Sequence, residues 1–196
     1  MSAGISYALV IGVENYNDAI SFKRVRNAAK DAIDFAKALE DLDVDSANIH
    51  ILTDGKATKT SIDKAIADIV RDVTEIDRII FYFSGHGAFE GGNNYLLPVD
   101  CFNDALPNTS IAINNVLGFF TRFPSTRNLM FLDCCHSGLN PGTEEKDGAR
   151  DFLVDMLKYN AREEEYTLIF ASCKSHQTSF THPTLPNSVW THFLLR

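Results

Sequence analysis

The chain has 196 residues, of which 45% are hydrophobic and 22% charged, and its formal net charge is −8. This length and balance are typical of a globular domain with a substantial core. The acidic charge argues against a nucleic-acid partner, and no apolar run approaches the roughly 18 residues that cross a bilayer. We therefore expect neither nucleic acid nor membrane among its partners.

Strand-like and helix-like segments alternate along the chain. Nearly continuous apolar runs predict five strands, at residues 5–13, 48–52, 78–83, 128–133 and 166–171. Helical spacing of apolar residues predicts helices at 25–42, 61–73, 114–123 and, more weakly, 152–159. This order indicates an α/β fold in which helices cover both faces of a mostly parallel sheet.

Local signals add detail to this outline. Thr60 or Ser61 is placed to cap the second helix, and residues 91–94 have the Gly-Gly-Asn-Asn composition of a hairpin tip. Residues 141–150 are predicted to form a mobile loop. Residues 188–196 begin an amphipathic helix whose apolar face would carry Val189, Trp190, Phe193 and Leu194.

The cysteines indicate a reducing compartment rather than a zinc site or a disulfide framework. Cys101, Cys134, Cys135 and Cys173 show no CxxC spacing, and two of them are adjacent. The N-terminus lacks the basic start and apolar stretch of a signal peptide. We expect a cytoplasmic protein with no metal site, in which a thiol stays usable for chemistry.

Two short motifs follow predicted strands and carry the residues that could perform catalysis. They are Ser84-Gly85-His86-Gly87 and Asp133-Cys134-Cys135-His136-Ser137-Gly138. We expect each on a Gly-containing loop beyond the carboxyl end of its strand, where active residues of parallel sheets gather. His86 precedes Cys135 by 135 − 86 = 49 positions, the caspase-type spacing. A thiol held beside an imidazole forms a nucleophile able to cleave peptide bonds.

The chain resembles the caspase-like cysteine peptidases, and within them the metacaspases and their bacterial relatives. The matching segments cover almost the whole chain in order: Tyr7 to Val13, Tyr16, Asn27 to Ala32, Ser84 to Gly87, Leu97 to Asp100, Asp133 to Gly138, Ala171 to Cys173, and Gln177. The resemblance implies a three-layer α/β/α sandwich whose full domain has about six strands. It also implies peptide-bond hydrolysis by a cysteine–histidine dyad.

By this resemblance Cys135 is the nucleophile and His86 its base, whereas Cys134 is a packed residue. The backbone N–H groups of Gly87 and Cys135 are implied as oxyanion donors. His136 is expected to lie outside the dyad, because adjacent residues at a strand end point apart. No third catalytic side chain is evident, and the family does not require one.

The resemblance also implies a binding pocket for the substrate residue before the cut, the S1 pocket, formed by Asp31, Ser84 and Asp133. Animal caspases, which cut after Asp, carry Gln where this chain has Asp133. Two carboxylates in a narrow pocket favour Arg or Lys and repel Asp. We therefore expect protein or peptide substrates with a basic residue before the cut. Ala28 departs from the pattern, because some metacaspases have a cysteine there.

Metacaspases are often activated by calcium, but the sequence assigns no calcium site and no other cofactor. Asp100, Asp104, Asp147 and Asp151 are candidates only by their charge. No metal ligands are therefore predicted.

We interpret residues 1–196 as a caspase-like peptidase domain, truncated or processed at its C-terminal end. It would be the regulated protease domain of a larger protein, with a partner domain or fragment beyond Arg196. Self-cleavage after Arg196 and an artificial chain end are both open. A catalytically silent caspase-like domain used for protein–protein assembly is the main alternative, and a hydrolase or transferase acting on non-peptide substrates is another.

Overall fold

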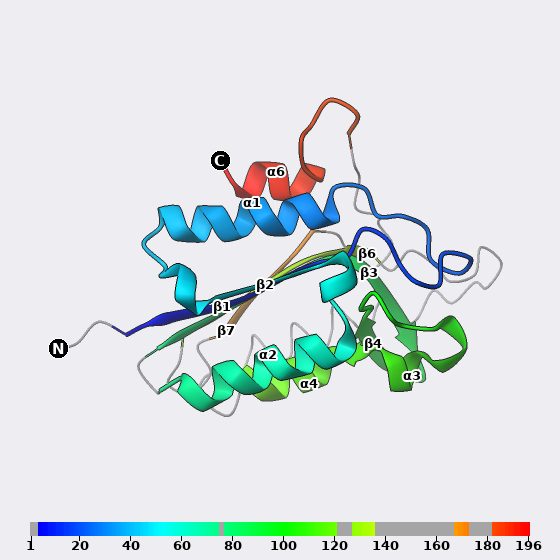
Figure 1. Ribbon diagram of the computed structural model, residues 1–196, viewed down its shortest axis with the longest axis horizontal. Coiled ribbons are helices and arrows are strands. Elements are labelled where there is room, and N and C mark those ends of the chain that lie inside the picture. Colours follow the sequence, from blue (N-terminus) through cyan, green and yellow to red (C-terminus); the bar gives the residue numbers. More distant parts are fainter. Residues whose placement is uncertain (1–3, 75–76, 121–126, 136–166, 173–181) are drawn as a thin grey trace.

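The computed structural model describes residues 4–74, 77–120, 127–135, 167–172 and 182–196, apart from the side chain of Cys135. Within these residues a parallel sheet has the order β2-β1-β3-β6-β7 (Figure 1). Its strands are β1 (Ser6–Gly12), β2 (Ile49–Thr53), β3 (Arg78–Glu90), β6 (Arg127–Cys135) and β7 (Thr167–Ala171). All five predicted strands are confirmed.

The central strands are apolar on both faces because both faces are covered. Along β1, Leu9 and Ile11 belong to one buried cluster, whereas Ala8 and Val10 belong to another. β3 repeats the alternation with Phe81 and Tyr82. Since successive side chains of a strand point to opposite faces, a continuous apolar run fills two cores at once.

Helices form the outer layers on each side of the sheet (Figure 1). Helices α1 (Ala28–Asp41) and α6 (Val189–Leu194) lie on one face, and α2 (Lys59–Asp72) and α4 (Ile113–Phe120) lie on the other. Phe35 of α1 stacks on Tyr82 with ring centroids 4.3 Å apart. Together with the parallel sheet, this layering confirms the predicted α/β caspase-like sandwich.

A second, antiparallel unit extends one end of β3. Strand β4 (Asn93–Leu96) pairs with the last residues of β3, and β5 (Ile111–Ala112) pairs with β4. Gly91 and Gly92 form the connecting turn with φ values of 57° and 80°, a conformation that glycine adopts without strain. The predicted hairpin tip is therefore confirmed. Helix α3 (Leu106–Thr109) and the 3-10 turns Ser46–Asn48, Asp54–Lys56 and Asn103–Ala105 complete the described elements.

Two local predictions were wrong. The cap of α2 is Thr58, whose side chain accepts a hydrogen bond from the Ser61 N–H, and neither Thr60 nor Ser61 has this role. Several residues near this point could cap the helix. The start of α2 is fixed by a tertiary contact, in which the Asp100 carboxylate accepts the Lys59 N–H at 2.8 Å. On α6 the predicted apolar face is right for Trp190 and Leu194, which pack partly buried against the core, but wrong for Phe193, which is 64% exposed, and it omits the buried Thr191.

The predicted loop at 141–150 and helix at 152–159 lie outside the described residues. Across the parts of the chain that are described, no helix is long and apolar enough to span a bilayer.

Candidate functional site

The two motifs lie side by side because β3 and β6 are adjacent parallel strands. Their register pairs Ser84 with Asp133, Gly85 with Cys134, and His86 with Cys135. The motifs were expected on loops beyond the strands, but these residues lie within β3 and β6 themselves. The reason is that β3 continues past the sheet into its hairpin with β4, which extends the backbone through His86. The side chain of Cys135 and all of His136 lie outside the described residues.

His86 is held by the segment that connects β1 to α1, residues 13–27. Its Nε2 lies 2.7 Å from the Lys23 carbonyl oxygen, and its backbone N–H donates to the Tyr16 hydroxyl at 2.7 Å. The Tyr16 ring packs against the imidazole with centroids 5.1 Å apart. A carbonyl oxygen only accepts hydrogen bonds, so Nε2 carries the hydrogen. In the neutral ring the lone pair is then on Nδ1.

Burial lowers the pKa of His86, and the hydrogen bond to the Lys23 carbonyl opposes this effect only in part. A lowered pKa favours the neutral imidazole, which is the form able to accept a proton. The hydrogen bond to the Lys23 carbonyl fixes the tautomer of His86 in which Nδ1 is the basic atom, so Nδ1 is the atom that can accept the proton.

Two buried carboxylates meet on the face of the sheet covered by α1 and α6. Asp31 on α1 is fully buried, and Asp133 on β6 is 3% exposed. The Ser188 N–H lies 3.1 Å and 3.3 Å from the two oxygens of Asp31, and the Ser188 hydroxyl donates to Asp133. Thr191 adds a hydrogen bond to Asp133 at 2.8 Å and also contacts the Tyr82 hydroxyl at 2.6 Å. The start of α6 therefore joins both acids.

Burial raises the pKa of Asp31 to about 6, and the nearby charge of Asp133 adds to the effect. The Asn187 side chain and the Ser188 N–H favour the carboxylate and limit the rise. No ion pair between described residues includes Asp31. A carboxylate in this setting gains strongly from a cation brought to it.

The other predicted residues are placed as follows. Ser84 is buried beside Asp133 in the strand register. Gly87 lies on β3 opposite Leu96 of β4. Cys134 is part of the larger apolar cluster, as expected of a packed residue.

Sequence reasoning gave no role in this site to four residues: Tyr16, Lys23, Ser188 and Thr191. Of these, only Tyr16 was among the residues that carry the family resemblance. Lys23 acts through its backbone carbonyl, which no side-chain pattern reveals. Ser188 and Thr191 have the spacing of a helix cap, and the Ser188 side chain does accept from the Thr191 N–H. That spacing could have located the start of α6, but not its contact with the two acids.

Within the described residues, no three His, Cys, Asp or Glu side chains come together as metal ligands. Asp100, one of the calcium candidates, accepts the N–H of Lys59 at the start of α2. Asp147 and Asp151 lie outside the described residues.

Two curated proteins are similar to this chain in sequence. The probable protease of a Desulfuromonadales bacterium is 30% identical over 76% of this chain and 20% of its own length. The human mucosa-associated lymphoid tissue lymphoma translocation protein 1 is 23% identical over 95% of this chain and 21% of its own length. The chain thus spans about a fifth of the length of these curated relatives.

The fold has a counterpart among solved structures, and the sequence matches a family model. A Geobacter sulfurreducens protein superposes with a TM-score of 0.71 at 18% identity, covering 97% of this chain and 80% of its own. The peptidase C14 caspase-domain model matches residues 5–196. With its parallel sheet and paired histidine and cysteine motifs, the chain belongs to the caspase-domain family of peptidases.

Proposed function

We propose that this chain is a cysteine endopeptidase domain that cleaves peptide bonds after Arg or Lys, using Cys135 as nucleophile and His86 as base. The observation that carries the proposal is the strand register, which pairs His86 with Cys135 across two adjacent strands. Backbone register is set by the whole sheet, so the backbones of the two residues lie opposite one another without depending on a loop conformation.

The state of His86 suits the first chemical step. A neutral imidazole with hydrogen on Nε2 takes the thiol proton at Nδ1, and the thiolate attacks the scissile carbonyl to form a tetrahedral adduct. The backbone N–H groups of Gly87 and Cys135 stabilise its oxyanion. Collapse of the adduct gives a thioester as the imidazolium returns its proton to the leaving amine. Water, deprotonated by His86, then hydrolyses the thioester and restores the thiol.

The preference for Arg or Lys is supported by the paired acids. Asp31 and Asp133 converge on Ser188, and the raised pKa of Asp31 reflects an environment that disfavours its charge. A guanidinium or ammonium group brought to the pair would favour the ionised form, whereas a substrate Asp would add a third negative charge. Ser84, opposite Asp133 on the neighbouring strand, would line the same pocket.

The domain would act within a larger, regulated protein. This part of the proposal is supported by the relatives, of which the chain spans about a fifth. The resemblance to metacaspases suggests that calcium activates the domain, so the assay below is run with and without calcium.

The test compares fluorogenic peptides ending in Arg, Lys or Asp, with and without calcium, for the wild type and two alanine variants. Cys135→Ala should abolish turnover of Arg and Lys peptides. Cys134→Ala is the matched control, since it removes the adjacent thiol, and it should retain turnover. Loss of activity only in Cys134→Ala would overturn the assigned nucleophile, and a preference for Asp peptides would overturn the pocket. A wild type that is inert to every peptide and to a thiol-reactive peptide probe would favour the assembly role.

A further inference from the structure

We propose that Tyr16 and Asp54 are positioning residues that fix the orientation and tautomer of His86, although neither belongs to the predicted catalytic motifs. The proposal rests on the proposed role of His86 as base. It concerns the segment 13–27, which we call the β1–α1 segment.

The β1–α1 segment holds His86 at two points. The Tyr16 hydroxyl accepts the His86 backbone N–H, which fixes the main chain, and the Lys23 carbonyl accepts from Nε2, which fixes the ring. The rings of Tyr16 and Phe22 also flank the imidazole, with centroids 5.1 Å and 6.2 Å away. Any shift of this segment therefore moves the Tyr16 hydroxyl and the Lys23 carbonyl together relative to His86.

Asp54 anchors the start of that segment. Its Oδ1 accepts from the Glu14 N–H at 2.8 Å and from the Asn15 N–H at 3.0 Å, immediately before Tyr16. Asp54 has a φ of 43°, in the left-handed region that non-glycine residues seldom occupy. Such a conformation persists when surrounding contacts stabilise it, and the two hydrogen bonds to the segment are contacts of that kind.

The segment is also closed on itself beyond this anchor. The Val25 N–H donates to the Glu14 carbonyl at 2.9 Å, and the Glu14 carboxylate pairs with Arg24. Arg24 and Val25, the two residues that follow Lys23, are thus tied back to Glu14, whose own N–H is bound to Asp54. A displacement at Asp54 would pass through Glu14 to the Lys23 carbonyl.

Gly85 provides the space that Tyr16 needs. A Cβ atom at this position would lie 2.9 Å from the Tyr16 hydroxyl and 3.0 Å from the Phe83 ring. The glycine before His86 is therefore required so that the hydroxyl can reach the His86 N–H. This observation is independent of the hydrogen bonds and points to the same contact.

The experiment measures the tautomer and protonation midpoint of His86 by ¹⁵N NMR of histidine-labelled protein, with the signal assigned from a His86→Gln variant. Peptide kinetics are recorded alongside. The variants are Tyr16→Phe, which keeps the ring and removes the hydroxyl, and Asp54→Ala. Asp54→Asn is the conservative partner, because an amide oxygen accepts the same two hydrogen bonds and Asn tolerates the left-handed region.

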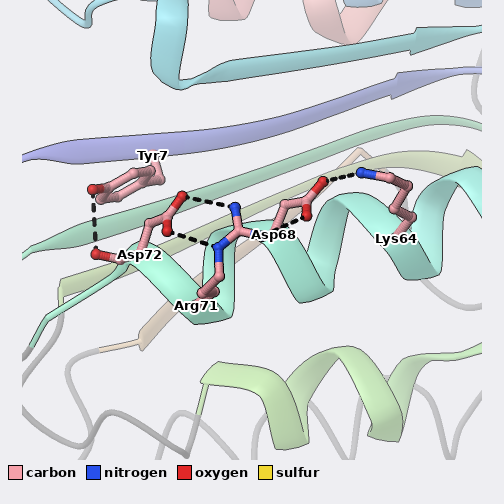
Figure 2. Close-up of polar contacts among 5 residues, drawn as sticks. All are labelled: Tyr7, Lys64, Asp68, Arg71 and Asp72. Carbon is pink, nitrogen blue, oxygen red and sulfur yellow. Dashed lines mark hydrogen bonds and ion pairs between the residues drawn. The ribbon is translucent and has the colours of Figure 1, made fainter.

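Two control variants make equivalent changes away from His86. Tyr7→Phe removes a hydroxyl that donates to the Asp72 carbonyl at 3.4 Å, at the end of α2 (Figure 2). Asp45→Ala removes a carboxylate that accepts from the Ala47 N–H at 2.9 Å, at the opposite end of β2 from Asp54. Both controls should leave the His86 signals unchanged.

In the wild type the Nε2–H tautomer should dominate. Tyr16→Phe and Asp54→Ala should give a mixture of tautomers and a protonation midpoint closer to that of an ordinary imidazole, and Asp54→Asn should behave like the wild type. In an active enzyme, Tyr16→Phe should lower kcat about tenfold with little change in KM.

The two proposals can fail separately. If the NMR changes occur in a protein that cleaves no peptide, the positioning role stands and the proposed activity fails. If folded Tyr16→Phe and Asp54→Ala proteins keep the wild-type tautomer and midpoint, the positioning role is wrong, whatever the activity.

Discussion

Replacing Asp31 by Asn should make the protein more stable at neutral pH while weakening cleavage after Arg and Lys. Asp31 is fully buried on α1, and its carboxylate accepts the Ser188 N–H. The amide oxygen of Asn can accept the same hydrogen bond, so the substitution removes the charge and keeps the contact. What changes is the free energy of holding a carboxylate in this buried position.

The size and sign of the effect follow from the pKa of Asp31. That pKa is raised from 3.8 to about 6 by burial first and by Asp133 next. Between these two pH values the unfolded chain releases a proton that the folded protein retains, so stability falls as pH rises and remains low above about 6. A difference of about two pH units at 1.36 kcal/mol each corresponds to about 3 kcal/mol. Asp31→Asn should recover up to this amount at pH 7.

The assay is urea unfolding of the wild type and of Asp31→Asn between pH 4 and pH 7. Subtracting the two stability curves removes the titration of other groups. The matched control is Asp34→Asn, which makes the same substitution on the same helix, α1. Burial would raise the pKa of Asp34, but hydrogen bonds from Lys30 and Asn187 lower it overall. Asp34 therefore contributes stability that is lost on acidification, and its removal should destabilise the protein at pH 7.

The reasoning would be refuted if the difference between the wild type and Asp31→Asn were constant across this pH range. It would also be refuted if Asp31→Asn were the less stable protein at pH 7. Stabilisation without any loss of Arg and Lys cleavage would leave the electrostatic argument intact and remove Asp31 from the proposed pocket.

Two further substitutions test how the site is supported. Gly12→Ala places a Cβ atom 2.3 Å from the Ala28 carbonyl oxygen, so α1 must move away from β1. We expect a loss of about 1–3 kcal/mol in urea unfolding, with weaker peptide turnover. Unchanged stability would contradict this close approach. Thr58→Ala removes the cap that accepts the Ser61 N–H and should cost about 1 kcal/mol with normal turnover; a fall in kcat would show that α2 matters to the site.

The fold was predictable because its strands are apolar on both faces. A run such as the one ending at Phe83 has few alternatives to a buried parallel strand, and the helices between the runs fix the class. Element ends were less predictable. Thr58, Thr60 and Ser61 are all acceptable caps, and the contact of Asp100 with the N–H of Lys59 selects the first.

For the site, the sequence by itself determined which residues form the two motifs and that each motif comes at the end of an apolar, strand-like run. His86 and Cys135 were identified by residue type, spacing and family resemblance, all of which are local or ordered along the chain. Only the tertiary structure decided that the motifs continue the strands in one register and that Asp31 and Asp133 share Ser188. It also decided that the Lys23 carbonyl fixes the His86 tautomer. Apart from the bond between the Ser188 hydroxyl and Asp133, these contacts join residues far apart in sequence through backbone atoms, which have the same chemistry at almost every position and so leave no pattern to read.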